Sequence, residues 1–297
     1  MPIPSLLAIF VLALVGALLA RLPWLRGPWH AGVTELTARF LVPALLLGST
    51  WRTGIPASVS WQVLCAFYLP LALMFFLARH VGARAAAQDG SAAALAATYS
   101  NTVFVGVPVL VQAFGADSLQ FAYPVIAFHS LFCFSLYHFA GEGKSGWTAA
   151  LASTLRNPIV VALLLGLSLN LARIRLPPAL TGALDMLGAA ALPCALLSLG
   201  GSVALLRPGR PLATGAIIVA KLLLLPLGVW CLATLLDLPA AATQVLVLLA
   251  CCPVGVNAAF VVKPGGGGAR LVNSAILLSS LACVATIPVW LWVLHGR

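Results

Sequence analysis

Long apolar segments separated by short polar breaks make up almost the whole chain. A membrane-spanning helix needs about 20 predominantly apolar residues, and segments of this kind recur along all 297 residues. The breaks contain glycine, proline and charged residues, which end helices and form turns. The pattern predicts an all-α integral membrane protein with ten spans, at residues 4–20, 34–51, 58–78, 91–113, 118–139, 156–172, 179–203, 212–236, 240–262 and 271–294.

The composition agrees with a membrane protein and argues against a soluble one. Charged residues are only 7% of the chain, whereas soluble domains carry about 25%. The formal net charge is +10, but the lysines and arginines stand singly or in pairs between apolar segments. This distribution sets topology in membrane proteins. We therefore expect membrane lipids, and no nucleic acid, as partners.

The basic residues also predict the orientation. With the N-terminus outside, ten lysines and arginines of the connecting segments lie on the cytoplasmic side and four lie outside. Basic residues are enriched in cytoplasmic loops, and an even number of spans returns the chain to its starting side. The prediction is a multi-pass protein of the inner (plasma) membrane with both termini on the periplasmic or extracellular side. The first apolar segment lacks a preceding basic region, so we expect it to be a retained span.

Enzyme chemistry has little support in the sequence. The seven cysteines all fall in apolar segments and show no metal-binding spacing. We find no nucleotide-binding loop, zinc-protease motif or nucleophile elbow. We therefore expect no catalytic residues, no metal and no cofactor. An intramembrane enzyme and a channel remain rival interpretations, and saturable flux with counterflow would distinguish a carrier from a channel.

Two stretches of the chain resemble each other at a distance of 150 residues. They are TELTARFLVPALLLG at 34–48 and LDMLGAAALPCALLSLGG at 184–201. Each has an acidic residue, a proline eight residues later and an aliphatic run that ends in glycine. This repetition divides the chain into two five-helix repeats, 1–145 and 146–297. Because each repeat has an odd number of spans, the two insert with opposite orientation, as in many secondary transporters.

The fourth and ninth predicted spans are interrupted at corresponding places. The interruptions lie in ATYSNTVFVGVPVLVQAFG (97–115) and ACCPVGVNAAFVV (250–262). Matching interrupted segments in the two halves of a transporter indicate the binding site. Half-helix N-termini carry positive partial charge and free N–H groups, which suits a small anion such as a carboxylate. The candidate substrate-binding residues are Ser100, Asn101, Thr102, Gly106, Pro108, Pro253, Gly255 and Asn257. The alternative is a pair of ordinary proline kinks with interhelical hydrogen bonds.

Lys221 and His129, two further polar residues in the spans, have two interpretations each. Lys221 either attracts the anion or braces the crossing, or else it extends to the cytoplasmic interface. His129 is either a proton relay or a hydrogen-bonded interhelical histidine. Tyr99 is a supporting group of the cavity. Glu35 is four residues before Arg39, a spacing that favours an ion pair on a helix.

These motifs, in this order, resemble the auxin efflux carrier family, which shares the ten-helix fold of the bile acid–sodium symporters. The resemblance rests on SNTVFVGVPVL, FLVPALLLG, RNPIVVALLLG, ALPCALLSLGG, KLLLLPLG and CCPVGVNAAFVV, and it extends over nearly the whole chain. Asn101 matches the asparagine of the family's first crossover and Pro253 the proline of the second. The loop KPGGGGAR departs from the family pattern, and the linker between the halves is short, as in bacterial members.

The resemblance implies a scaffold of spans 1, 2, 6 and 7. Spans 3–5 and 8–10 would form a moving transport domain in an elevator-type mechanism, with crossed helices 4 and 9 at the substrate. It also implies transport of small organic anions, and it leaves open a homodimer through the scaffold. Neither crossover contains Asp or Glu, so we expect export of an anion driven by the membrane potential. The alternative is a proton- or sodium-coupled symporter.

Overall fold

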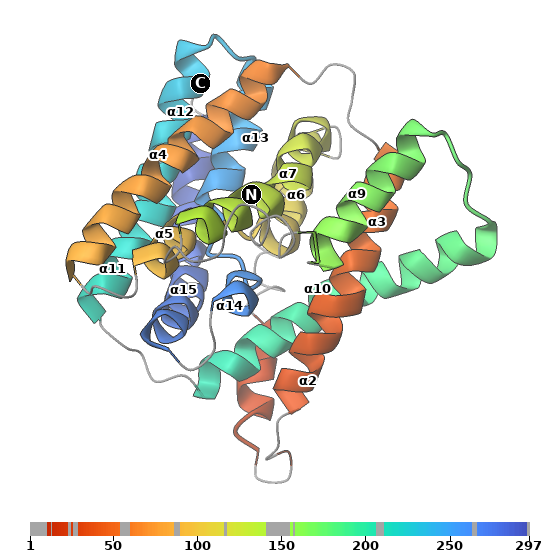
Figure 1. Cartoon of the computed structure of the whole chain (residues 1–297), viewed down its shortest axis with the longest axis horizontal. Coiled ribbons are helices and arrows are strands. Elements are labelled where there is room, and N and C mark those ends of the chain that lie inside the picture. The colour runs from red at the N-terminus through yellow and green to blue at the C-terminus, as the bar shows by residue number, and fades with distance from the viewer. Residues whose placement is uncertain are drawn as a thin grey trace. The chain divides into compact units, whose positions relative to one another are not determined.

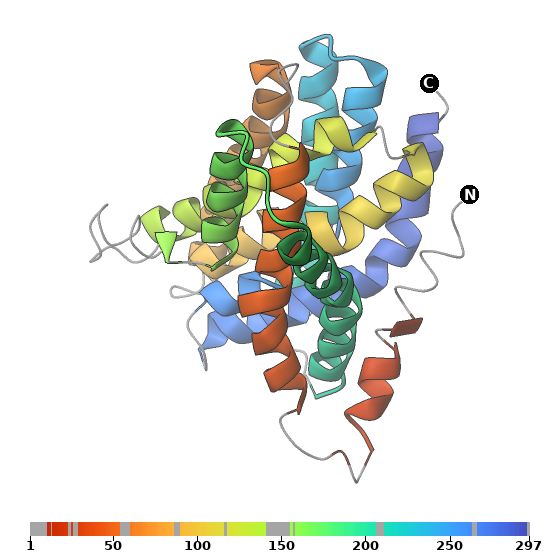
Figure 2. The ribbon, with the colours of Figure 1, turned by 90° about the vertical axis from the view of Figure 1, so that its right-hand side faces the viewer.

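A computed structural model describes residues 11–12, 14–22, 25, 29–53, 60–85, 90–115, 118–140, 155–156, 158–205, 211–262 and 266–295 (Figure 1). Over these ranges the structure is helical, and its only strand-like feature is an antiparallel bridge between Ser100 and Val254. The prediction of an all-helical fold is confirmed. Figure 2 shows the same helices, with the same colours, turned by 90° about the vertical axis.

Six helices in the described part of the chain are long and apolar enough to cross a membrane, judged by length and composition. Two shorter apolar helices, Pro158–Leu171 and Ala240–Cys251, accompany them. Eight of the 17 residues of the predicted span 4–20 lie outside the described residues. The predicted spans 91–113 and 240–262 are each broken into two helical pieces. The count of ten spans and their inverted repetition therefore stay predictions.

The chain divides into two compact units, and each takes segments from both halves of the sequence. Among the described residues, unit 1 contains 60–140 and 211–295, and unit 2 contains 11–53 and 155–205.

Beyond the helical residues near 11–19, the described part of unit 2 contains the following elements. They are α2 (Trp29–Leu36), η2 (Thr37–Leu41), α3 (Val42–Thr53), α9 (Pro158–Leu171) and α10 (Pro178–Leu205). Helix α3 packs along α9, as both views show (Figures 1 and 2), and it also packs against α10. The approach to α9 is close because a Cβ at Gly166 would lie 2.7 Å from the carbonyl oxygen of Leu47.

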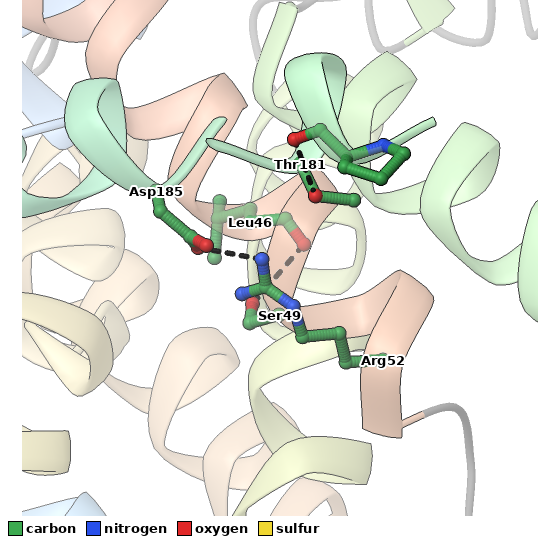
Figure 3. A network of polar contacts seen from close by, with 6 residues as sticks. Leu46, Ser49, Arg52, Thr181 and Asp185 are labelled. Atoms are coloured by element: carbon green, nitrogen blue, oxygen red, sulfur yellow. Dashed lines mark hydrogen bonds and ion pairs between the residues drawn. The ribbon is translucent and has the colours of Figure 1, made fainter. Parts of the chain in front are cut away.

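Polar contacts tie the end of α3 to α9 and α10. Figure 3 shows the contact with α10, between Arg52 and Asp185. The Arg52 guanidinium forms an ion pair with Asp185 at 2.5 Å. The Trp51 indole donates to the Ile174 carbonyl at 2.8 Å, and the Asn170 amide donates to the Trp51 carbonyl at 2.6 Å. These bonds link the end of α3 to residues that lie more than 100 positions later in the sequence. Asp185 thus has an ion-pair partner inside unit 2.

The other acidic residue of the repeated motif is also paired. Glu35 and Arg39 form an ion pair at 3.1 Å with spacing i, i+4, which confirms the pairing expected from the sequence. Both side chains are exposed, at 62% and 66%, so the pair contributes little to stability.

Unit 1 contains the remaining described helices. They are α4 (Trp61–Ala85), α5 (Gly90–Thr98), η3 (Thr102–Gly106), α6 (Val107–Phe114), α7 (Leu119–Ala140), α11 (Pro211–Val219), η5 (Ala220–Leu224), α12 (Leu225–Leu235), α13 (Ala240–Cys251), α14 (Ala258–Val261) and α15 (Gly267–His295). Helix α4 packs on α5 and α12, and α15 packs on α5, α11 and α13. Helix α5 is almost entirely buried, and so is α13 from Ala242 to its end at Cys251. Unit 1 therefore encloses the helix ends at which both interruptions begin.

Within the ranges that the structure describes, three π-helical turns each end two residues before a proline. The pairs are η2 with Pro43, η3 with Pro108 and η5 with Pro226. In η2 and η5 the N–H of the residue just before the proline donates to the carbonyl five residues earlier, Val42 to Thr37 and Leu225 to Ala220. In η3 the Gly106 N–H donates to the Asn101 carbonyl, also five residues earlier. Proline lacks an N–H and its ring clashes with the preceding turn of an α-helix. A widened turn relieves that clash, and such turns are frequent at functional sites.

Candidate substrate site at two broken helices

The first interruption is short and lies earlier than the sequence pattern suggested. Helix α5 ends at Thr98, residues 99–101 are not helical, and the helix resumes at Thr102 through η3 and α6. Gly106 and Pro108, predicted as part of the break, lie in the resumed helix instead. Proline is tolerated in the first turn of a helix, and Pro108 is the second residue of α6.

The second interruption is longer. Helix α13 ends at Cys251, residues 252–257 are not helical, and only the four-residue helix α14 follows before residue 262. Pro253 cannot donate a hydrogen bond, and its ring clashes with a preceding helical turn, so α13 stops before it. The prediction of a break at Pro253, Gly255 and Asn257 is therefore correct at the level of the backbone.

The two breaks pair with each other through the backbone. The Asn101 N–H donates to the Pro253 carbonyl at 2.8 Å, and the Gly255 N–H donates to the Tyr99 carbonyl at 3.0 Å. Ser100 and Val254 face each other in the antiparallel bridge between these bonds. Non-helical backbone inside a membrane is tolerated only where protein or water satisfies it. Here each interruption supplies hydrogen-bond partners to the other.

Glycine is required at 255 because the ring of Tyr99 lies directly against it. A Cβ at this position would be 2.5 Å from Cε1 and 2.7 Å from Cδ1 of Tyr99. The carbonyl oxygen of Ser100 would be 3.1 Å away. Glycine, which lacks a Cβ, leaves room here for a side-chain ring and for the backbone of the other interruption.

Lys221 connects the first interruption to the end of α13 through one ammonium group. Its side chain is fully buried, at 0% exposure, so the interpretation that it extends to the membrane interface is wrong. The Nζ atom donates to the Ser100 hydroxyl oxygen at 2.9 Å and to the Ala250 carbonyl at 2.6 Å. Ala250 is in the last turn of α13, where unpaired carbonyls carry negative partial charge. Lys221 therefore braces the crossing and places a positive charge beside Ser100.

His129, from α7, is a hydrogen-bonded interhelical residue. Its Nε2 accepts a hydrogen bond from the Ser100 N–H at 2.8 Å, so the proton of the neutral ring is on Nδ1. The ring stacks on Tyr99 with centroids 5.0 Å apart, and it is 1% exposed. Of the two interpretations from the sequence, the structural one accounts for every contact described.

A small hydroxyl and amide cluster connects the two breaks beyond the backbone. The Tyr99 hydroxyl is 2.9 Å from the Ser130 hydroxyl, and the Asn257 amide donates to the Tyr99 hydroxyl at 3.5 Å. The Ser279 hydroxyl accepts a hydrogen bond from the Val254 N–H at 2.9 Å. Ser130 and Ser279 were not among the predicted residues. Their only sequence signal is a serine within an apolar span, which many structural serines share.

All of the predicted site residues come from unit 1. Ser100, Asn101 and Thr102 are buried, with exposures of 2%, 5% and 4%, and Asn257 is half-buried. Of the supporting residues, Lys221 and His129 contact the first interruption, and Tyr99 belongs to it. Among the described residues there is no cluster of three or more His, Cys, Asp or Glu side chains that could hold a metal ion.

The fold and the paired interruptions define a class of protein, a multi-pass membrane protein with broken helices buried in one unit. Residues 147–291 match the model of a family described as membrane transport protein. This match confirms the resemblance to auxin efflux carrier-type membrane transporters.

Two curated relatives extend the similarity over almost the full length. A "Putative malonate transporter" of Rhizobium meliloti is 27% identical over 318 aligned positions, which cover 98% of this chain and 95% of the relative. An "Uncharacterized transporter" of Methanothermobacter thermautotrophicus is 26% identical over 302 positions, covering 98% of this chain and 97% of the relative. The family match and the relatives support a membrane transporter.

Proposed function

We propose that this protein is a secondary transporter of small organic anions, carboxylates above all, with its substrate site at the two paired interruptions. The observation that carries the proposal is the pair of backbone hydrogen bonds from Asn101 to Pro253 and from Gly255 to Tyr99. A lone proline kink has no reason to meet a second kink from the other half of the chain. Interrupted helices that meet in this way are the usual setting of a transport site.

The charges around the interruptions favour an anion. The helical segment 102–114, formed by η3 and α6, starts at the first interruption, so its N-terminal N–H groups face that region. A helix N-terminus carries about half a positive charge. The Lys221 ammonium donates a hydrogen bond to the hydroxyl of Ser100, which belongs to the first interruption. Thr102 and Asn257 add neutral donors, as the sequence predicts. The Rhizobium meliloti relative, named for malonate, supports a carboxylate.

An elevator-type alternating-access mechanism follows from the proposed roles of the two units. Unit 2 would be the scaffold and unit 1 the moving transport domain. The separation of the chain into these two units supports this assignment, as does the network that ties α3, α9 and α10 together in unit 2. The same proposal includes a homodimer in which two copies of the chain contact each other through unit 2.

We further propose export driven by the potential across the inner membrane, with both termini outside. The segments 90–115 and 240–262 contain no Asp or Glu, so the interruptions lack the carboxylates that commonly bind sodium or carry protons. A potential of 100 mV supplies about 2.3 kcal/mol for each charge. A negative cytoplasm therefore favours outward movement of an anion.

The test is malonate transport by the purified protein in liposomes. Labelled malonate outside should enter against unlabelled malonate trapped inside, and net flux should follow a potential set with potassium and valinomycin. Protein-free liposomes and liposomes with the Asn101→Ala variant are the controls. Flux without counterflow would indicate a channel. Flux that ignores the potential but collapses without a sodium or proton gradient would replace the uniport with a coupled symporter.

A further inference from the structure

Lys221 is the only buried Lys, Arg, Asp or Glu among the described residues. The ion pairs found in the described part of the chain, Glu35 with Arg39 and Asp185 with Arg52, are both in unit 2. The other charged side chains described in unit 1 are exposed and lie at or near helix ends: Arg79, Arg84, Asp237 and Arg270. The apolar interior of unit 1, as far as the structure describes it, therefore holds one formal charge.

Dipoles, rather than a counter-ion, stabilise this charge. The acceptors of the Lys221 ammonium are the Ser100 hydroxyl, two residues beyond the end of α5, and the Ala250 carbonyl, in the last turn of α13. Both helices end at the crossing, and a helix C-terminus carries negative partial charge. Helix dipoles solvate the ammonium, yet each helix as a whole has no net charge. The formal charge of the interior stays at +1.

We propose that Lys221 compensates the charge of the substrate, so that unit 1 loaded with a monovalent carboxylate crosses the membrane electrically neutral. This inference rests on the proposed function, in which unit 1 moves. Empty, unit 1 carries +1 through the membrane field. Loaded with a monocarboxylate it carries 0, and loaded with a dicarboxylate dianion it carries −1. The potential then acts on the return of the empty unit during net transport of a monocarboxylate.

The expected effect is large enough to measure in an exchange experiment. With saturating substrate on both sides, only the loaded unit crosses, and no empty return is needed. For a loaded unit of charge −1, a potential of 100 mV accelerates one crossing and slows the other by about sevenfold each, if the barrier lies midway. The exchange cycle then slows by roughly threefold to fourfold. For a neutral loaded unit, the exchange rate does not change.

The wild-type protein provides the first test, with labelled lactate and labelled malonate at pH 7.5. Each is present at equal, saturating concentration on both sides of proteoliposomes held at 0 or 100 mV. We expect the lactate exchange rate to be the same at both potentials and the malonate exchange rate to be roughly threefold to fourfold lower at 100 mV. Lactate exchange that slows with potential would overturn the charge compensation while leaving a functioning carrier. An absence of exchange for both compounds would overturn the proposed function itself, and this inference with it.

Two variants separate the charge of Lys221 from its hydrogen bonds. In Lys221→Met, lactate exchange should become sensitive to potential, because the loaded unit now carries −1. In Lys221→Arg, which keeps the charge but changes the hydrogen-bond geometry, lactate exchange should stay insensitive even if its rate falls. A purely structural role predicts lower rates in both variants with no change in potential dependence, and that result would contradict the proposal. If malonate alone is exchanged, its slowing should steepen in Lys221→Met, and an unchanged slowing is the contradicting result.

Discussion

Substitution of Gly255 by alanine tests the close contact between the two interruptions. The new methyl group would lie 2.5 Å from Cε1 and 2.7 Å from Cδ1 of the Tyr99 ring. The ring has little room to retreat, because it stacks on His129 and its hydroxyl bonds Ser130 at 2.9 Å. Inserting a methyl group into a well-packed interior costs about 1–3 kcal/mol. The Tyr99 hydrogen bond adds about 1 kcal/mol if the ring moves far enough to break it.

The assay is the melting temperature of the purified protein in detergent. A loss of 1 kcal/mol lowers the melting temperature by roughly 2–4 °C in proteins of 150–250 residues, so Gly255→Ala should lower it by several degrees. The matched control is Gly215→Ala in α11, where a Cβ would meet nothing within 4 Å. That variant should melt at or slightly above the wild-type temperature, because alanine favours a helix over glycine.

A double-mutant cycle shows whether the Tyr99 ring is the cause. In a Tyr99→Ala background the added methyl group at 255 has no ring to meet. The cost of Gly255→Ala should then fall by most of its value, since substitutions of contacting residues are not additive. An equal cost in both backgrounds, or a Gly255→Ala protein as stable as wild type, would refute this account of the crossing.

Two further predictions concern the site and the orientation. Asn101→Ala and Asn257→Ala should each leave a folded protein but weaken malonate binding by about 10- to 150-fold, because a lost hydrogen bond to a charged group costs about 1.5–3 kcal/mol. Malonate binding is measured by thermal shift. Unchanged binding in both variants would place the substrate site elsewhere. In a cysteine-free background, a cysteine at Arg297 should react with an impermeant thiol reagent from the periplasm and one at Ser145 should not, and the opposite labelling would reverse the topology.

The sequence alone determined that the chain is a helical membrane protein with two interrupted apolar segments. Apolar length predicts spans because the lipid interior demands internally hydrogen-bonded backbone, and this depends only on composition along the chain. The interruptions were also predictable, since Pro253 and Gly255 act on the backbone locally. The position of the first break was less accurate. Pro108 suggested a break there, yet a π-helical turn in residues 102–106 accommodates it, and this turn depends on surrounding packing.

The tertiary structure alone decided the role of Lys221. A lysine nine residues into an apolar segment has a flexible side chain that can reach the membrane interface or the interior. The choice depends on which acceptors lie within its reach, and here these are Ser100 and Ala250, 121 and 29 residues away in sequence. The same holds for His129, whose partner Ser100 is 29 residues away. Contacts of this range arise only when packing brings separate helices together, so local sequence pattern does not contain them.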